Sequence, residues 1–386
     1  MSALLGIPLA TLTAPGTIEL SLLTAASLLP PRARDAESRP CRRIAVVVPA
    51  HDEREGITRC VKSLLACDPA GCEVEIVVVA DNCTDDTADV ARKAGARVLE
   101  RRNPNLRGKG YALEYAFDSL MAEHADLDGL IVVDADTDVE PTFLAAFARR
   151  FSDGADALQC RYLVRDPGES QRKRLMNVAF MAFNVVRPRG RDRLGLSCGI
   201  LGNGFGLSRR CLEAVPYAAR SVVEDLEHHL DLVRAGYRVE FVDETCVRGD
   251  MPDAGKGVET QRARWEGGRM RMMREKAPGL IAEIAKGRLK LTEPLLELML
   301  LPLATHVGLL GVTLLVPFPP TQIAAAVGLG SVGAHVLAAL KVGGADREDL
   351  KALAGAPLYI AWKAKLLPKI LGAAKEEQEW VRTERA

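Results

Sequence analysis

Two aspartates with one residue between them, Asp134 and Asp136, follow the apolar run of residues 130–133. A continuous apolar run rich in β-branched residues is typical of a strand buried on both faces of a parallel sheet. Ligands of open α/β sheets bind just outside the carboxyl ends of the strands, so we expect both carboxylates at the mouth of a site. Alternation along a strand points both toward one ligand. Carboxylates of this kind bind Mg²⁺ or Mn²⁺, commonly together with substrate phosphates.

An isolated Asp-x-Asp is more often a solvated turn, so further polar residues must support the site. The apolar run of residues 44–48 leads into Pro49, His51 and Glu53, and that of residues 74–80 leads into Asp81. Each alone would be interpreted as a helix cap or a loop residue. Together they predict one polar edge of one sheet. No G-x-G-x-x-G follows the first strand, which disfavours a dinucleotide site.

Strands and helices must alternate to position these residues. Apolar runs of strand length recur along the chain, and segments with helical periodicity separate them; this alternation is typical of βαβ units and predicts an α/β fold. The predicted strands are residues 44–49, 74–80, 96–99, 130–133, 157–164 and 237–242. A glycine-rich segment, residues 199–206, allows close backbone approach to a ligand or serves only as a turn.

Two later stretches carry charged residues. Glu224 and Asp225 open a predicted helix, where the helix dipole favours carboxylates, so a structural and a catalytic role are equally supported. Residues 261–265 lie in a basic helix in which Arg262 and Trp265 share a face. Arginine can clamp a phosphate and tryptophan can stack on a sugar or base. The alternative is a solvated basic face with one packing tryptophan.

Composition excludes some classes of protein. The 386 residues contain 51 Lys+Arg and 51 Asp+Glu, so we expect no general attraction to nucleic acid. Nine cysteines without a C-x-x-C pair indicate a reducing compartment and no disulfide framework. No His/Cys cluster has the spacing of zinc ligands.

Three segments are apolar enough to meet a membrane. Residues 4–29 contain two prolines and Glu19, so whether they span the bilayer or lie on it stays open. Residues 295–316 and 321–340 are separated by a proline-rich break and have basic flanks, which predicts a two-helix hairpin with its flanks in the cytoplasm. A buried soluble hairpin is the alternative. The amphipathic stretch that follows suits the membrane interface.

These motifs, in this order, resemble those of the family 2 glycosyltransferases with a GT-A fold, the group of cellulose synthase, hyaluronan synthase and chitin-oligosaccharide synthases. The resemblance covers about residues 43–274. Residues 49–53 and Asp81 look like the two nucleotide motifs, and the Asp-x-Asp looks like the family's D-x-D. Glu224-Asp225 looks like the E-D motif. Residues 261–265, Gln-Arg-Ala-Arg-Trp, fit Q-Q/R-x-R-W, which is the most specific match.

The resemblance implies a GT-A type, Rossmann-like sheet with flanking helices, plus a C-terminal membrane-associated helical hairpin. On this basis we expect an N-terminal apolar membrane-associated segment at 1–38 and a glycosyltransferase domain at 39–280. A transmembrane hairpin is expected at 281–345, with an amphipathic interfacial helix and a charged tail at 346–386.

The resemblance also implies a role for each site residue. Asp225, beside Glu224, would be the general base, and Asp136 with Asp134 would hold a divalent metal, Mg²⁺ or Mn²⁺. The nucleotide-sugar would contact Pro49, His51, Glu53, Asp81, Lys109 and Asp134. The diphosphate and the acceptor end would contact Gln261, Arg264 and Trp265.

The function implied is inverting transfer of a hexosyl or N-acetylhexosaminyl group from a nucleotide-sugar donor, expected to be a UDP-sugar. The acceptor would be a saccharide or lipid-linked, at the cytoplasmic face of the inner membrane, in cell-surface polysaccharide or glycolipid synthesis. Room for only two or three membrane helices, and Val223 where several synthases have threonine, argue against secretion of a polymer. The alternatives are a sugar-phosphate nucleotidylyltransferase and a non-catalytic membrane scaffold.

Overall fold

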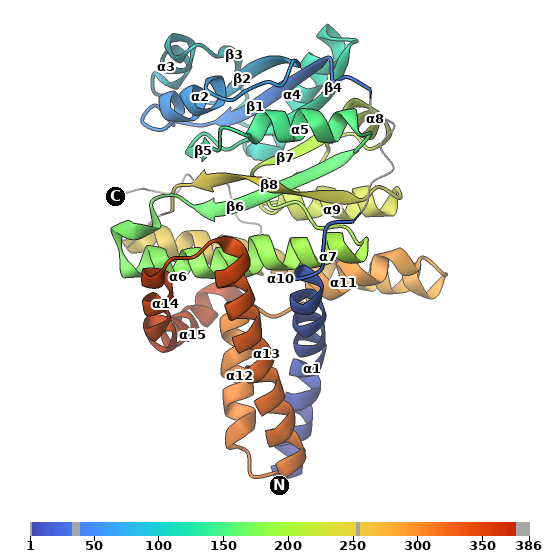
Figure 1. The fold of residues 1–386 in the computed structure, drawn as a ribbon, viewed down its shortest axis with the longest axis vertical. Helices are drawn as coiled ribbons and strands as arrows, with labels where there is room; N and C mark the ends of the chain where they lie inside the picture. The colour runs from blue at the N-terminus through green and yellow to red at the C-terminus, as the bar shows by residue number, and fades with distance from the viewer. Residues whose placement is uncertain (1, 33–38, 252–254, 376–386) are drawn as a thin grey trace. The chain divides into compact units, whose positions relative to one another are not determined.

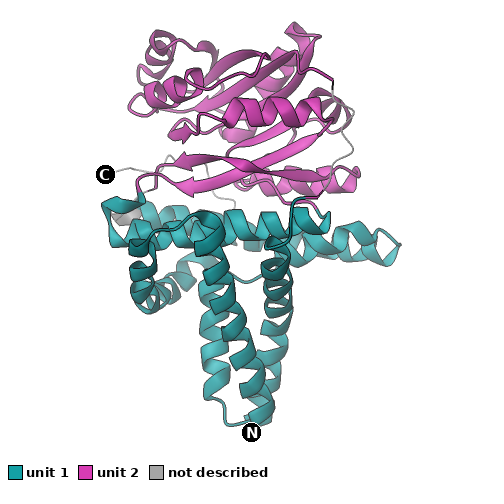
Figure 2. Ribbon diagram, in the orientation of Figure 1, with its two compact units in different colours: residues 1–31, 167–196, 253–378 teal, residues 32–166, 197–252, 379–386 magenta. Residues whose placement is uncertain are grey.

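The computed structural model describes residues 2–32, 39–251 and 255–375 (Figure 1). The chain folds into two compact units that interleave along the sequence, drawn in two colours in Figure 2. One comprises residues 1–31, 167–196 and 253–378, and the other residues 32–166, 197–252 and 379–386. We call them the helical unit and the sheet unit.

The sheet unit contains one eight-stranded mixed sheet with the strand order β3-β2-β1-β4-β7-β6-β8-β5. Its strands are β1 (Arg43–Ala50), β2 (Glu73–Asp81), β3 (Arg97–Arg101), β4 (Leu127–Val132), β5 (Thr137–Val139), β6 (Ala157–Val164), β7 (Phe205–Ser208) and β8 (Val239–Gly249). β1 pairs in parallel with β2 and with β4, so the carboxyl ends of these three strands lie along one edge. The short β7 is inserted antiparallel between β4 and β6.

Helices pack on the sheet and complete its core. They are α2 (Ile57–Leu65), α3 (Thr87–Ala94), α4 (Lys109–Glu123), α5 (Phe143–Ser152), α8 (Arg209–Ala214) and α9 (Glu224–Arg234). The apolar runs of β1 and β4 are buried, as expected for strands covered on both faces. Ile131 of β4 and Phe143 of α5 belong to the same fully buried core. This core is a rigid support for the loops at the carboxyl edge.

The helical unit consists of α1 (Ser2–Ser27), α6 (Gln171–Phe180), a π-helical segment (Met181–Val186), α7 (Arg187–Leu194), α10 (Gly255–Ala285), α11 (Thr292–Met299), α12 (Leu303–Leu315), α13 (Pro319–Gly343), α14 (Arg347–Ala352) and α15 (Ala356–Ala373). Three-residue 3₁₀ turns lie at Pro167–Glu169, Leu289–Leu291 and Leu353–Gly355.

Polar side chains hold α1 within the helical unit. The Ser21 hydroxyl donates to Ser331 at 2.9 Å, and Thr24 Oγ1 lies 2.7 Å from His335 Nδ1, so α1 is bound along α13 (Figure 1). Arg191 of α7 is 2% exposed and pairs with carboxylates of α1 and α11. Its partners are Glu19 at 2.8 Å, Glu297 at 3.3 Å and Glu293.

Among the described residues, two helices, α1 and α13, are long and apolar enough to cross a membrane. The segments Leu289–Met299 and Leu303–Leu315 would add a third span if the pair, which is bent by 76°, acts as one. In the predicted interfacial segment, α15 carries Tyr359 and Trp362 with ring centroids 5.5 Å apart. The charged tail, residues 376–386, lies outside the described residues.

All six predicted strands are present, and two further strands had not been predicted. β5 has three residues and β7 has four, and runs this short show no measurable alternation. Both owe their existence to pairing partners that are distant in sequence, because β5 pairs with β8 and β7 pairs with β4 and β6.

Candidate active site

Asp134 and Asp136 lie at the carboxyl edge, directly after β4, as predicted. The Thr137 backbone N–H donates to the Asp134 carbonyl at 3.1 Å, so the two aspartates lie in a tight turn that leads into β5. The prediction that strand alternation orients the two carboxylates was therefore wrong, because the strand ends before Asp134. The Thr137 hydroxyl donates to Asp136 Oδ1 at 3.1 Å.

Lys109 binds the first aspartate of this turn. It is the first residue of α4, and its ammonium donates to Asp134 Oδ1 at 2.5 Å and also to the Gly202 carbonyl. Although burial disfavours the charged ammonium, the carboxylates of Asp134, Glu224 and Asp225 raise the pKa of Lys109. The structure therefore brings Lys109, predicted to contact the nucleotide, into the same cluster as the Asp-x-Asp and E-D residues.

Asp225 is the second residue of α9 and is half-buried. Its Oδ1 accepts the backbone N–H of Leu226 at 2.8 Å, and the N-cap position is taken by Val223, which has no capping side chain. Burial and the neighbouring Glu224 raise the pKa of Asp225 to about 7. A carboxylate with a pKa near neutrality is suited to take up and release a proton.

The glycine-rich segment approaches Asp225 closely. Gly202 has a φ of +80°, and a Cβ atom at this position would lie 3.1 Å from Asp225 Oδ2. At Gly204, with a φ of +68°, a Cβ would lie 2.5 Å from the sulfur of Cys160. The glycines therefore allow a left-handed backbone and a close approach of this backbone to neighbouring side chains. Through Gly202 the segment contacts both Asp225 and Lys109, which binds Asp134.

The loops after β1 and β2, strands that neighbour each other in the sheet, form a second polar cluster. His51 Nδ1 lies 2.7 Å from the Asp81 carbonyl, and the Glu53 backbone N–H donates to Thr87 Oγ1 at 2.8 Å. The Asp81 carboxylate is buried and accepts from Arg101 Nη1 at 2.6 Å. Pro49, the residue before the end of β1, is paired with Val79 of β2.

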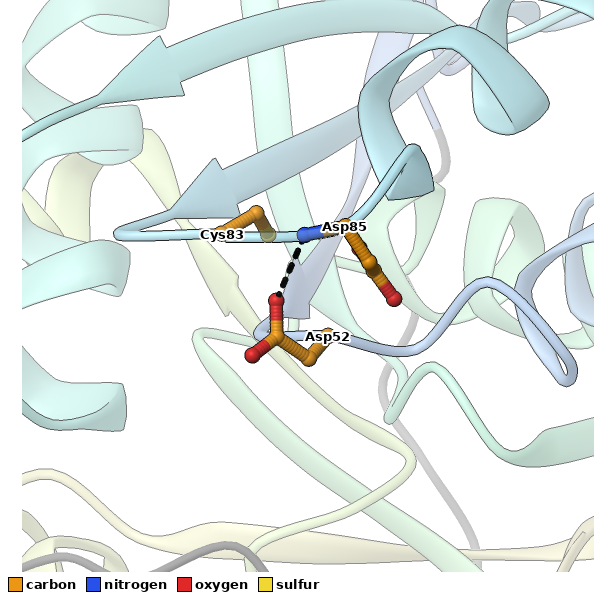
Figure 3. A group of neighbouring side chains, drawn as sticks. All are labelled: Asp52, Cys83 and Asp85. Atoms are coloured by element: carbon orange, nitrogen blue, oxygen red, sulfur yellow. Dashed lines mark hydrogen bonds between the residues drawn. The ribbon is translucent and has the colours of Figure 1, made fainter.

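One group of three potential metal ligands occurs among the described residues: Asp52, Cys83 and Asp85, with ligand atoms within 4.8 Å of one another (Figure 3). The Asp52 carboxylate accepts the Thr84 backbone N–H at 2.7 Å and its hydroxyl at 2.9 Å, and the Asp85 N–H at 3.2 Å. Partial burial acts to raise the pKa of Asp52, but these hydrogen bonds lower it. The carboxylate thus joins two loops, which explains the cluster without an ion.

Gln261, Arg264 and Trp265 lie on α10 in the helical unit. The Arg262 guanidinium lies 5.5 Å from the centroid of the Trp265 ring, so the predicted shared face is confirmed. The next residue, Glu266, pairs with Lys363 of α15 at 2.5 Å. Contact of α10 with a diphosphate or an acceptor stays a prediction.

Three polar residues of the site had not been predicted: Arg101, Gln159 and Asn203. Arg101 is the last residue of β3, two residues beyond the predicted strand 96–99, so its place near the carboxyl edge was a usable signal. Asn203 lies between two glycines with left-handed backbone conformations. A polar side chain in such a loop was a weaker signal of a site residue. Gln159 lies within an apolar strand and is fully buried, and a buried polar residue there requires internal hydrogen bonds.

Comparison with known proteins places this geometry among glycosyltransferases. Residues 40–268 match the family model described as "Glycosyltransferase like family 2". A probable glycosyltransferase, YdaM, of Bacillus subtilis is 23% identical over 237 residues, which are 58% of this chain and 55% of that protein. The undecaprenyl-phosphate 4-deoxy-4-formamido-L-arabinose transferase of Edwardsiella ictaluri is 30% identical over 98 residues, 25% of this chain and 29% of that protein.

The chain thus spans about half the length of the first relative and under a third of the second. Among solved structures, the mannosyltransferase PcManGT from Pyrobaculum calidifontis, in complex with GDP-Man and Mn²⁺, is similar with a TM-score of 0.57 at 15% identity. That match covers 98% of this chain and 99% of the other. At this identity the likeness establishes the fold, and it extends over both units.

Proposed function

Because the chain belongs to the glycosyltransferase-like family 2, we propose that it transfers a sugar from a nucleotide-diphosphate sugar to a membrane-proximal acceptor, with inversion at the anomeric carbon. The observation that carries this proposal is the cluster formed by Lys109, Asp134, Glu224 and Asp225 at the carboxyl edge of the sheet. It combines hard oxygen ligands with a carboxylate of pKa about 7. Metal-assisted transfer with inversion uses both, the first for the leaving diphosphate and the second for the acceptor proton.

A divalent metal fits the donor set. Three carboxylates act on the single ammonium of Lys109, which leaves an excess of negative charge, and Asp136 adds another oxygen donor beside Asp134. Mg²⁺ and Mn²⁺ bind to one or two carboxylates and complete their coordination with substrate phosphates. Asp136 and Asp134 would hold the ion, and when bound it supplies positive charge for the leaving diphosphate. The similar mannosyltransferase is in complex with Mn²⁺, which agrees with this choice.

Asp225 is the proposed general base. It would accept the proton of the acceptor hydroxyl while the hydroxyl oxygen attacks the anomeric carbon from the face opposite the nucleotide. The bond from that carbon to the diphosphate oxygen breaks in the same step, so the configuration inverts. Burial, and after it the charge of Glu224, keep the pKa of Asp225 raised. Lys109 would hold Asp134 in place and offset charge near the donor.

The nucleotide would bind at the second polar cluster, where Asp81 offers a buried carboxylate beside His51. We propose a UDP-sugar as donor, with a hexosyl or N-acetylhexosaminyl group. Because the similar mannosyltransferase is in complex with GDP-Man, GDP-sugars must be tested as donors alongside UDP-sugars. Gln261, Arg264 and Trp265 are proposed to contact the diphosphate and the acceptor.

A lipid-linked acceptor is supported by two observations. The helical unit has two helices long and apolar enough to cross a membrane, and one relative is named for undecaprenyl-phosphate. An acceptor held in the bilayer would need an enzyme anchored beside it. We further propose that the sheet unit faces the cytoplasm, where nucleotide-sugars are made.

The test is release of nucleotide diphosphate by the purified full-length protein, screened over UDP- and GDP-sugars with Mg²⁺ and Mn²⁺ and with added membrane lipids. Release of UDP or GDP that depends on lipid supports the proposal. Release of pyrophosphate from a nucleoside triphosphate and a sugar phosphate would instead indicate a nucleotidylyltransferase. Neither binding nor turnover of any nucleotide would indicate a scaffold.

A further inference from the structure

Three buried polar side chains support the turn that carries Asp134 and Asp136, through hydrogen bonds to one another and to the backbone. They are those of Gln159 of β6, Asn203 of the glycine-rich segment and Thr137 of β5, and each of the three side chains is 0% exposed. Buried polar groups are costly unless every one of them is hydrogen-bonded. The hydrogen-bond chain that they form therefore has a fixed geometry.

Asn203 forms the centre of this chain. Its Oδ1 accepts the backbone N–H of Asp134 at 3.1 Å, and its Nδ2 donates to Thr137 Oγ1 at 2.8 Å. A backbone N–H can only donate, so the amide oxygen must face Asp134 and the amide nitrogen must face Thr137. The orientation of the carboxamide is thus decided by chemistry.

Thr137 transmits this orientation to the second aspartate. Its hydroxyl accepts from Asn203, so its proton is directed away from Asn203 and toward Asp136 Oδ1, 3.1 Å distant. One carboxamide therefore fixes the backbone of Asp134 and, through one hydroxyl, the carboxylate of Asp136.

Gln159 holds the segment that presents Asn203. Its Oε1 accepts the Leu201 N–H at 2.8 Å, and its Nε2 donates to the carbonyls of Asn203 at 2.8 Å and Gly204 at 3.2 Å. The glutamine side chain thereby supplies hydrogen bonds that an irregular buried loop lacks.

We infer that Asn203 and Thr137 are positioning residues that pre-set the two aspartates for the metal and the donor diphosphate. This inference rests on the proposed function and adds residues to it. Groups that orient metal ligands typically change metal affinity or activity by about 10-fold to 100-fold when they are removed. Neither residue would touch the substrate.

The decisive variant is Thr137→Val, which keeps the shape of the side chain and removes the hydroxyl. The matched control is Thr245→Val on β8, where a threonine that is 1% exposed accepts one hydrogen bond, from Thr142 at 3.2 Å, and has no link to the Asp-x-Asp turn. Thr137→Ser keeps the hydroxyl and serves as the rescue variant. Asn203→Asp keeps the acceptor for Asp134 but cannot donate to Thr137.

The measurement is Mn²⁺ binding by electron paramagnetic resonance, with saturating UDP and, separately, GDP, on full-length protein in detergent, alongside thermal unfolding. We expect Thr137→Val and Asn203→Asp to weaken Mn²⁺ binding by about 10-fold to 100-fold. Thr137→Ser should restore most of it, and Thr245→Val should retain it. The double variant Thr137→Val/Asn203→Asp should bind Mn²⁺ no more weakly than either single variant, because both substitutions break the same hydrogen-bond chain.

The outcomes separate this inference from the proposed function. If the parent binds Mn²⁺ with neither nucleotide, the proposed function is refuted and this inference falls with it. If the parent binds and Thr137→Val binds as well as Thr245→Val, only the positioning role is refuted. If Thr137→Val and Thr245→Val lose thermal stability alike and bind Mn²⁺ equally well, the positioning role is likewise refuted and the hydrogen bonds of Thr137 only stabilise the fold.

Discussion

Asp225 combines a pKa near neutrality with a place at the start of a helix that it does not cap. The raised pKa has a consequence for stability as well as for catalysis. The folded protein binds the proton of Asp225 more tightly than the unfolded chain, in which the pKa is near 3.8. Ionisation therefore costs stability, and this cost is fully present above pH 7, shrinks as the pH falls toward 4 and disappears below it.

We predict that Asp225→Asn lowers the transfer rate by roughly 10²-fold to 10⁴-fold, the usual contribution of a positioned general base. Nucleotide-sugar binding should stay near that of the parent, because the amide keeps the size of the carboxylate. At pH 8 the variant should unfold at a higher temperature than the parent, and the difference should shrink at pH 5. A stable variant with parental turnover would refute the role of Asp225 as base.

The pH dependence of the parent provides an independent check. Only ionised Asp225 can accept the acceptor proton, so kcat/KM should fall as the pH decreases below about 7. The fall should approach tenfold for each pH unit. A flat profile between pH 5 and 8, measured with saturating metal, would mean that no group of pKa near 7 takes part.

Asp136 is expected to bind the metal directly. Replacing it by alanine removes a charged oxygen ligand without disturbing the buried strand before it, so divalent-dependent turnover should be abolished while the unfolding temperature changes little. Excess EDTA should have the same effect on the parent protein, reversed by Mn²⁺. Full activity of Asp136→Ala, or of the parent in EDTA, would exclude this assignment.

At the scale of elements, the helical unit depends on one buried arginine. Arg191 joins α7 to α1 and α11 through three carboxylates. Exchanging a buried ion pair for a well-packed apolar pair is often neutral, but removing one partner alone leaves buried charge uncompensated and costs about 3–5 kcal/mol.

Arg191→Met should therefore lower the unfolding temperature of the detergent-purified protein sharply. Arg193→Met is the control on the same helix: the guanidinium of Arg193 donates to the Leu29 carbonyl at 3.2 Å and pairs with the neighbouring Asp192 at 3.4 Å. Adding Glu293→Gln to Arg191→Met should recover part of the loss. Equal unfolding temperatures for the parent and Arg191→Met would show that the cluster contributes no net stability.

At the scale of the whole molecule, the apolar helices predict firm attachment to membranes. The full-length protein should resist extraction by carbonate and by high salt and should require detergent. Deletion from residue 291 onward should weaken this attachment, because it removes α13 and leaves α1 as the remaining long apolar helix. Full-length protein that is monodisperse in buffer without detergent would show that these helices pack only against the protein.

The amino-acid sequence by itself determined the strands, the polar residues that end them, and the family to which they belong. These features are local: burial on both faces requires a continuous apolar run, and parallel strands bring their carboxyl ends to one edge whatever follows. Asp81 and Asp134 could therefore be placed at this edge from their positions along the chain, whereas Asp225 was assigned a role only through the resemblance to the E-D motif. The apolar runs of α1 and α13 were recognisable for the same reason.

Only the tertiary structure decided which groups meet. Lys109 contacts Asp134 across 25 residues, and Asn203 reaches the same aspartate across 69. No periodicity links positions so far apart, because their contact depends on the pairing of β7 with β4 and on left-handed glycines that turn the segment inward. The turn after β4 was likewise hidden, since alternation predicts orientation only while a strand continues. The pKa of Asp225 depends on burial by distant segments, which is why its direction could not be derived from Glu224 and the helix dipole alone.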